Sequence, residues 1–159
     1  MGLHRVNVRR RLLLGLFVPA VLSIPLAGCL APAPPPRVTA LAPDGGIVSA
    51  INAQRGANGL PGLATSGDLT NLAVGWANHD ASTGVLAHRD LNGIPGWAAL
   101  GEVLFLGPCG TSDAAVVGAW MGSPDHRAII LNPAFRWAGA GRACTSDGRA
   151  WVVADLGTL

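Results

Sequence analysis

Charged side chains are scarce in this chain, which has no lysine and in which only 13% of the 159 residues are charged. After the first 28 residues the arginines stand apart, which argues against the basic patch of a nucleic-acid-binding domain. No pair of cysteines is spaced Cys-x-x-Cys, so a thiolate zinc site or a redox dithiol is not expected. Neither Gly-x-Ser-x-Gly nor His-Glu-x-x-His occurs, which argues against two common hydrolase sites.

The first 28 residues have the parts of an export signal. Four arginines between Met1 and Arg11 are opposed by no acid, and an apolar run follows from Leu12 to Leu26. The run is short for a membrane span of about 20 residues and is typical of a signal peptide, although a retained membrane anchor is the alternative. Consecutive arginines also hint at twin-arginine export, but any basic leader supplies them.

Leu26-Ala27-Gly28-Cys29 resembles a lipobox, where bacterial lipoproteins are cut before a cysteine that is then acylated. We therefore predict a signal peptide over 1–28 and lipid on Cys29, which would anchor a monomer to the outer face of the bacterial cell membrane. A cysteine placed there by chance is the alternative. Prolines predict an extended stalk over 29–43, which would hold one domain, 44–159, off the lipid.

Removal of residues 1–28 would change the net charge of the chain and the role left for its cysteines. The formal charge of +2 falls to −2 because four arginines leave with residues 1–28. Of three cysteines, Cys29 is used for lipid, and Cys109 and Cys144 remain. An exported protein with two cysteines usually pairs them, so we predict a disulfide.

Apolar spacing and capping residues predict the secondary structure. Helices are expected to begin at Asp44, at Thr65 or Ser66, at Thr111 to Asp113, and at Ser123-Pro124. Strands are expected over 102–106, 135–144 and 150–156, with a turn at 146–148 joining the last two. Helices precede most strands, which indicates an α+β class or a three-layer sandwich rather than alternating βαβ units.

Five segments follow one another in a distinctive order. They are Asn-Ala-Gln-Arg over 52–55, Gly-Val-Leu-Ala-His over 84–88, Gly-Glu over 101–102, Trp-Met-Gly-Ser-Pro-Asp-His-Arg over 120–127, and the stretch 135–141. Together they resemble bacterial members of the CAP (SCP) superfamily, which includes cysteine-rich secretory proteins, antigen 5 and pathogenesis-related proteins. The resemblance runs over about residues 47–157, and Ser-Pro-x-His-Arg is its most specific part.

The resemblance implies a three-layer α-β-α sandwich with a cleft lined by two histidines and one or two glutamates. The matching residues here are His88, Glu102 and His126, which we expect to meet in one cleft and to bind a divalent metal, zinc first of all. The chain departs from the family pattern at Val103, where asparagine is usual. It also has Met-Gly-Ser over 121–123, where many eukaryotic members carry a second glutamate.

The surroundings of these residues in the sequence also allow an interpretation that does not depend on the family. Glu102 is the only glutamate and lies in an apolar strand, so it must be paired, metal-bound or protonated, unless it faces water from an edge strand. His126 falls in the first turn of a helix, where the dipole disfavours imidazolium, as a ligand or base requires; a structural histidine is the alternative. His88 alone is typical of a surface loop. Asp80 could reach the cleft, although a residue there more often caps or solvates a helix end.

Two functions follow from this cleft. The first is binding of a small or lipidic ligand, or of another envelope component, without catalysis. The second is a metal-dependent, peptidase-like hydrolase, since two histidines and a carboxylate are a usual catalytic zinc set. Binding is favoured, because no second carboxylate is evident as a general base once Glu102 is a ligand.

Overall fold

The computed structural model describes residues 36–159, so the predicted signal peptide, lipobox and Cys29 lie outside the described residues. The elements are β1 (Val38–Pro43), α1 (Gly45–Ala57), β2 (Ala64–Thr65), α2 (Gly67–Thr83), β3 (Ala99–Pro108), α3 (Asp113–Met121), α4 (Pro124–Ile130), β4 (Trp137–Thr145) and β5 (Arg149–Thr158). Within 36–159 no helix has the length and apolar character needed to cross a membrane.

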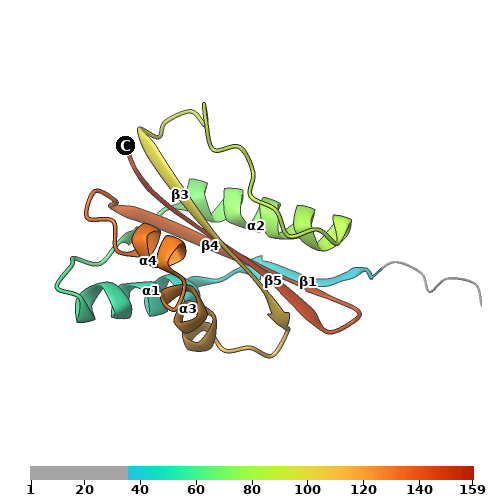
Figure 1. Ribbon diagram of the computed structural model, residues 1–159. Helices are drawn as coiled ribbons and strands as arrows, with labels where there is room; N and C mark the ends of the chain where they lie inside the picture. The colour runs from blue at the N-terminus through green and yellow to red at the C-terminus, as the bar shows by residue number, and fades with distance from the viewer. Residues whose placement is uncertain (1–35) are drawn as a thin grey trace, which may run out of the picture. The chain divides into compact units, whose positions relative to one another are not determined.

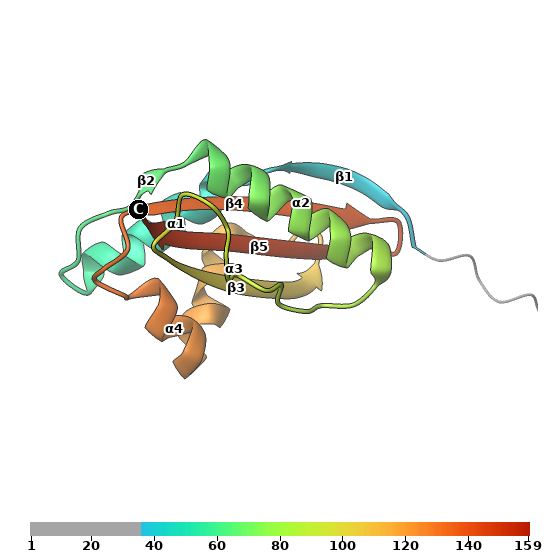
Figure 2. The ribbon, with the colours of Figure 1, turned by 90° about the horizontal axis from the view of Figure 1, so that it is seen from above.

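A five-stranded sheet forms the middle layer of the domain (Figure 1). Its order is β1-β4-β5-β3, with antiparallel neighbours, and the short β2 lies parallel to β4. Helix α2 covers one face, and α1, α3 and α4 cover the other (Figure 2). The predicted three-layer α+β sandwich is therefore confirmed.

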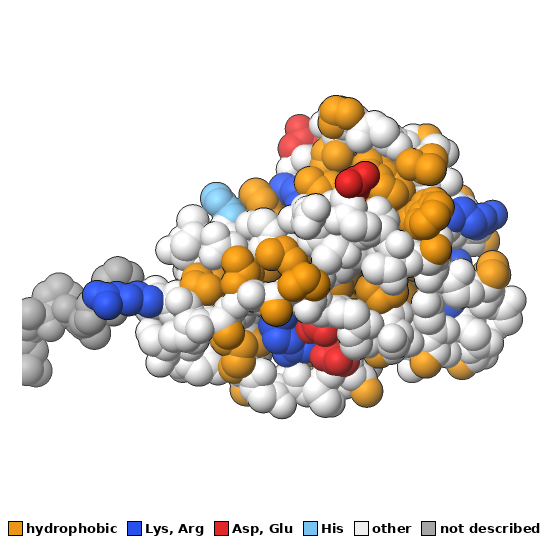
Figure 3. All heavy atoms as spheres, turned by 180° about the vertical axis from the view of Figure 1, so that it is seen from behind, with side chains coloured by type: hydrophobic (Ala, Val, Ile, Leu, Met, Phe, Trp, Pro, Cys, Tyr) orange, Lys and Arg blue, Asp and Glu red, His pale blue; other side chains and the backbone are white. Residues whose placement is uncertain are grey.

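Alternation along the strands divides the apolar core between the two faces. In β5, Trp151 and Val153 pack with α2, whereas Val152 and Ala154 pack with the three other helices. On the face of the molecule seen from behind, basic side chains stand apart from one another, and the one in the lower middle lies beside acidic side chains (Figure 3).

Helix α2 lies directly on β4, and glycine makes this possible. A Cβ atom at Gly139 would lie 2.1 Å from the backbone nitrogen of Thr70. At Gly141 it would lie 2.5 Å from the backbone of Val74. Backbone in α2 occupies both places, so a larger residue would force the helix off the sheet.

Capping residues locate the helix starts as predicted. The side chains of Asp44, Ser66 and Ser112 each accept a hydrogen bond from a backbone N–H in the first turn of α1, α2 and α3. Ser123 precedes α4, but its side chain makes no such bond there. Helix α2 ends at Gly84, whose φ of 73° is in the left-handed region that favours glycine.

Two predicted boundaries need correction. Residues 38–43 were expected to belong to the stalk, but they form β1 on the edge of the sheet, so ordered structure begins before residue 44. Most of β1 is exposed and shows no alternation, because its pairing partner β4 rather than a buried face defines it. Strand β3 extends beyond 102–106 at both ends because β5 pairs with all of its positions from Ala99 to Pro108.

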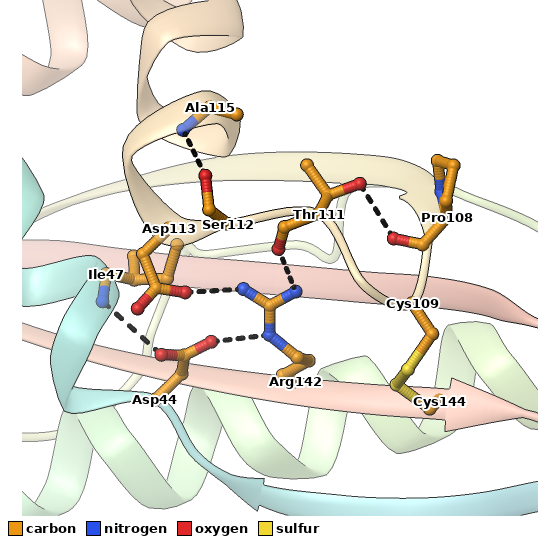
Figure 4. Close-up of polar contacts among 10 residues, drawn as sticks. All are labelled: Asp44, Ile47, Pro108, Cys109, Thr111, Ser112, Asp113, Ala115, Arg142 and Cys144. Carbon is orange, nitrogen blue, oxygen red and sulfur yellow. Dashed lines mark hydrogen bonds and ion pairs between the residues drawn. A yellow bond between two sulfur atoms is a disulfide. The ribbon is translucent and has the colours of Figure 1, made fainter.

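The predicted disulfide between Cys109 and Cys144 is confirmed, with Cα atoms 5.7 Å apart (Figure 4). It joins the segment that follows β3 to the end of β4. Nearby, the Arg142 guanidinium contacts the carboxylates of Asp44 and Asp113, each at 2.7 Å. This arginine therefore ties β4 to the starts of α1 and α3, on the same side of the sheet.

Candidate functional site

Glu102 is the polar centre of the site. It lies on β3 at the edge of the sheet, faces α2 as Leu104 does, and is only 2% exposed. His88, in the segment that follows α2, places Nδ1 2.9 Å from the Glu102 Oε1 atom. Because a carboxylate accepts and cannot donate, this contact assigns the proton of a neutral His88 ring to Nδ1 and leaves Nε2 as an acceptor. The His88 side chain is 57% exposed, so a ligand can reach it.

Arg89 holds the other side of Glu102. Its Nε atom lies 3.2 Å from Oε2, and its backbone N–H donates to Oε1 at 3.3 Å. The same guanidinium is ion-paired with Asp155, which lies opposite Glu102 on β5. Asp80 of α2 is also buried, and no side chain among residues 36–159 donates a hydrogen bond to its carboxylate. Two buried carboxylates thus share one arginine, and the third, Asp80, is near enough to Glu102 to feel its charge.

Burial raises the pKa of two of these carboxyl groups. Burial raises the pKa of Asp155 to about 7, against the lowering effect of Arg89, while the neighbouring Glu102 raises it further. Burial also raises the pKa of Asp80, although the backbone N–H of Ala87 opposes the shift. The role at the solvated helix end that the sequence favoured for Asp80 is wrong, because its side chain points into the domain and is 1% exposed.

Neither Arg89 nor Asp155 was identified from the sequence as part of the site. A signal was present for Asp155, because it is an acid within the apolar run of β5, just as Glu102 is in β3. For Arg89 the only signal was its place next to His88. Their pairing depends on the β3–β5 register, which joins distant parts of the chain.

His126 lies in the first turn of α4, with its ring centroid 6.5 Å from that of His88. The structure thus brings His88, Glu102 and His126 into one region. The pKa of His126 is lowered, first by burial and then by the charge of His88, against the effect of Asp125. Burial is therefore the leading cause, where the sequence had suggested the helix dipole. Either effect favours the neutral ring.

The donor set does not fit a three-ligand zinc site in this arrangement. Both carboxylate oxygens of Glu102 are engaged by His88 and Arg89. A zinc ion bound tetrahedrally by both imidazoles would bring their ring centroids to about 5 Å, closer than the 6.5 Å observed. Among the described residues, no three His, Cys, Asp or Glu side chains are placed to hold one metal ion. Zinc binding stays a prediction.

A cavity of about 520 Å³ opens beside this polar group, between β3, the segment after α2, and α4. Its lining residues are His88, Leu91, Leu100, Gly101, Glu102, Ala128, Ile129, Asn132 and Phe135. Gly101 allows α4 to approach β3, since a Cβ atom there would lie 2.7 Å from Cγ2 of Ile129. The result is a largely apolar hollow with polar groups at its rim, a usual form for a small-molecule site.

Comparison with known proteins gives one family and several similar structures. Residues 48–156, more than half of the chain, match the CAP family, described as the cysteine-rich secretory protein family. An outer surface protein of Borrelia burgdorferi is 22% identical, with a TM-score of 0.61, over 70% of this chain and 89% of that one. An extracellular SCP-domain protein of Bacillus anthracis is 20% identical, with a TM-score of 0.58, over 71% of this chain and 39% of that one. No protein with a curated description matches.

Proposed function

Because this chain belongs to the CAP family, we propose that it is an exported, lipid-anchored protein of the bacterial cell envelope that binds a small or lipidic ligand in the His88–Glu102 cleft. The observation that carries the proposal is the cavity of about 520 Å³, whose size suits a small organic molecule. Its apolar walls would take a hydrocarbon part, and His88 and Asn132 would bond a polar group of the ligand.

The charges around Glu102 favour binding over catalysis. His88 contacts one carboxylate oxygen of Glu102 and Arg89 contacts the other, so neither oxygen is free to take a proton from a ligand as a general base would. The cavity lining contains no serine, cysteine or threonine that could act as a nucleophile. Glu102 instead orients the His88 ring, so that Nε2 presents a fixed hydrogen-bond acceptor to a ligand.

A fluorescent fatty acid tests the cleft directly. Ala128→Trp would fill the cavity from α4, and we expect it to weaken probe binding at least about tenfold. Ala114→Trp is the matched control, an exposed alanine on the neighbouring α3 that does not line the cavity. Equal binding by both variants would place the probe elsewhere and contradict a ligand site in the cleft.

Observations outside the cleft support the proposed export and lipid anchoring of the protein. The leader and the Leu-Ala-Gly-Cys segment of residues 26–29 suit a lipoprotein, and the disulfide suits an oxidising compartment outside the cytoplasm. The similar Borrelia and Bacillus proteins are described as outer surface and extracellular proteins. We expect wild type in the membrane fraction and Cys29→Ala released or unprocessed. Wild-type protein found only in the soluble fraction would contradict the anchor.

One observation favours the second function, a metal-dependent hydrolase. A carboxylate that bonds the Nδ1 atom of a histidine, as Glu102 does with His88, is the usual support of a metal-ligating imidazole. Calorimetric titration with zinc tests this function. Equimolar zinc binding that is lost in both His88→Ala and His126→Ala would favour the hydrolase. A titration in which wild type binds no zinc would contradict it. Binding should weaken below about pH 6, where imidazole takes up a proton.

A further inference from the structure

Large apolar side chains are unevenly distributed over the domain surface. Five are exposed among residues 36–159, and three of them lie towards one end of the molecule: Val85 at 58%, Leu86 at 39% and Leu106 at 38%. Val85 and Leu86 are adjacent in the chain, just after Gly84 ends α2. Single exposed hydrophobic residues are normal, but three gathered at one end suggest a contact surface.

Independent contacts place these residues at the end where the described chain begins. Arg37 exchanges hydrogen bonds with Ser146 in the β4–β5 turn. Leu106 lies opposite Trp151 near the same end of the sheet, and Trp151 packs with Ala81 in the last turns of α2. Figures 1 and 2 both show the end of α2, the β4–β5 turn and the start of β1 together. We call Arg37, Val85, Leu86 and Leu106 the stalk end.

The sequence limits how far this end can stand from a lipid on Cys29. Only seven residues, 29–35, connect the predicted lipid site to Pro36. A fully extended chain spans at most about 3.6 Å per residue, so these residues reach no more than about 25 Å. A lipid on Cys29 would therefore hold the stalk end within a short distance of the bilayer.

We propose that the stalk end is a membrane-facing surface, with Val85 and Leu86 entering the interfacial layer of the bilayer beside the acylated Cys29. This inference rests on the lipid anchor of the proposed function. The apolar pair supplies burial at the headgroup boundary. Arg37 is exposed at the same end and supplies a positive charge for lipid phosphates.

This orientation has a consequence for the cleft. The cavity is lined by Leu100, Gly101 and Phe135, and Leu100 pairs with Gly157 near the far end of β5. Strand β5 begins at the stalk end and has ten residues, which at about 3.3 Å each separate its ends by roughly 30 Å. The cleft then begins at His88, two residues beyond Leu86, and extends away from the bilayer towards the far end of β5, so that we expect a ligand to enter from the side away from the membrane.

The test uses the full lipidated protein on vesicles of phosphatidylglycerol and phosphatidylethanolamine that contain a nitroxide-labelled lipid. An environment-sensitive fluorophore is attached at Val85→Cys in one sample and at Leu159→Cys in the other. Leu159 is the matched control, because it is 71% exposed and lies at the opposite end of β5. We expect lipid quenching at position 85 to exceed that at position 159 at least about threefold, and Leu86→Ser to reduce it.

Each outcome decides one question. Acylated protein with equal quenching at both positions would overturn the membrane-facing surface and leave the anchor intact. Mass spectrometry that finds no acyl group on Cys29 would overturn the anchor and this inference together. Disulfide-linked dimers of unlabelled Val85→Cys on the vesicles would assign the surface to a second copy of the chain and overturn the proposal.

Discussion

Replacing Arg89 by methionine should destabilise the domain in a way that depends on pH. Arg89 is the ion-pair partner of both Glu102 and Asp155, and all three side chains are largely buried. Methionine keeps the length and much of the volume of the side chain but removes the charge. The carboxylates then lose their compensating charge, and Asp80 nearby is a third buried acid, to which no side chain among residues 36–159 donates a hydrogen bond.

The expected loss of unfolding free energy follows from the burial of the ion pairs and from the pKa of Asp155. Removing one partner of a buried ion pair costs about 3–5 kcal/mol when the remaining group stays charged. The pKa of Asp155, about 7 when folded, is above its unfolded value of 3.8. Its contribution to stability is therefore fully present below about pH 4 and is lost as pH rises through about 7. Loss of Arg89 raises the pKa of Asp155 further. Protonation of Asp155 at acidic pH therefore removes the unpaired charge and reduces the loss of stability in the variant.

We therefore expect Arg89→Met to lower the free energy of unfolding by about 3 kcal/mol at pH 8 and by about 1 kcal/mol at pH 5. Urea unfolding at both pH values measures the difference. Adding Asp155→Asn should recover part of the loss at pH 8 and flatten the pH dependence. Arg127→Met is the control, since Arg127 is exposed and its side chain bonds only Asn58 among the described residues. A loss of equal size at both pH values would refute the reasoning.

Three further outcomes can be measured. Replacing Cys109 and Cys144 together by alanine should lower the free energy of unfolding by about 3–4 kcal/mol, given their separation of 35 residues; a loss under about 1 kcal/mol would contradict this. Gly139→Ala should cost more than about 3 kcal/mol in urea unfolding because its Cβ would meet the α2 backbone, whereas Gly118→Ala, with nothing within 4 Å, should not destabilise. In NMR titration His126 should show a lowered pKa, and His88→Ala should raise it; an unchanged value would exclude coupling between the two rings.

Local signals explain why much of the fold could be predicted. A cap acts within one helical turn, so Ser66 and Ser112 mark the starts of α2 and α3 without knowledge of their neighbours. The disulfide needed only a count, because two cysteines remain once Cys29 is set aside. The grouping of His88, Glu102 and His126 came from the order of family motifs, since their spacing alone forms no known site.

Other features depend on contacts between distant residues. Strand β1 was missed because its pairing with β4, and not its own pattern, makes it a strand. The stalk end combines residues near 37, 85 and 106, which only the folded chain brings to one end.

The sequence by itself determined the four helices, the last three strands and the disulfide, and it predicted His88, Glu102 and His126 as a group, because capping, cysteine count and motif order are properties of the chain. Only the tertiary structure decided how those residues are used. The β3–β5 register places Asp155 opposite Glu102, and Arg89 occupies the space between them. Burial then makes these charges depend on one another, because a carboxylate removed from water must be paired or protonated. The chain alone shows Glu102 as an acid within an apolar strand, and the fold buries it and supplies its partners.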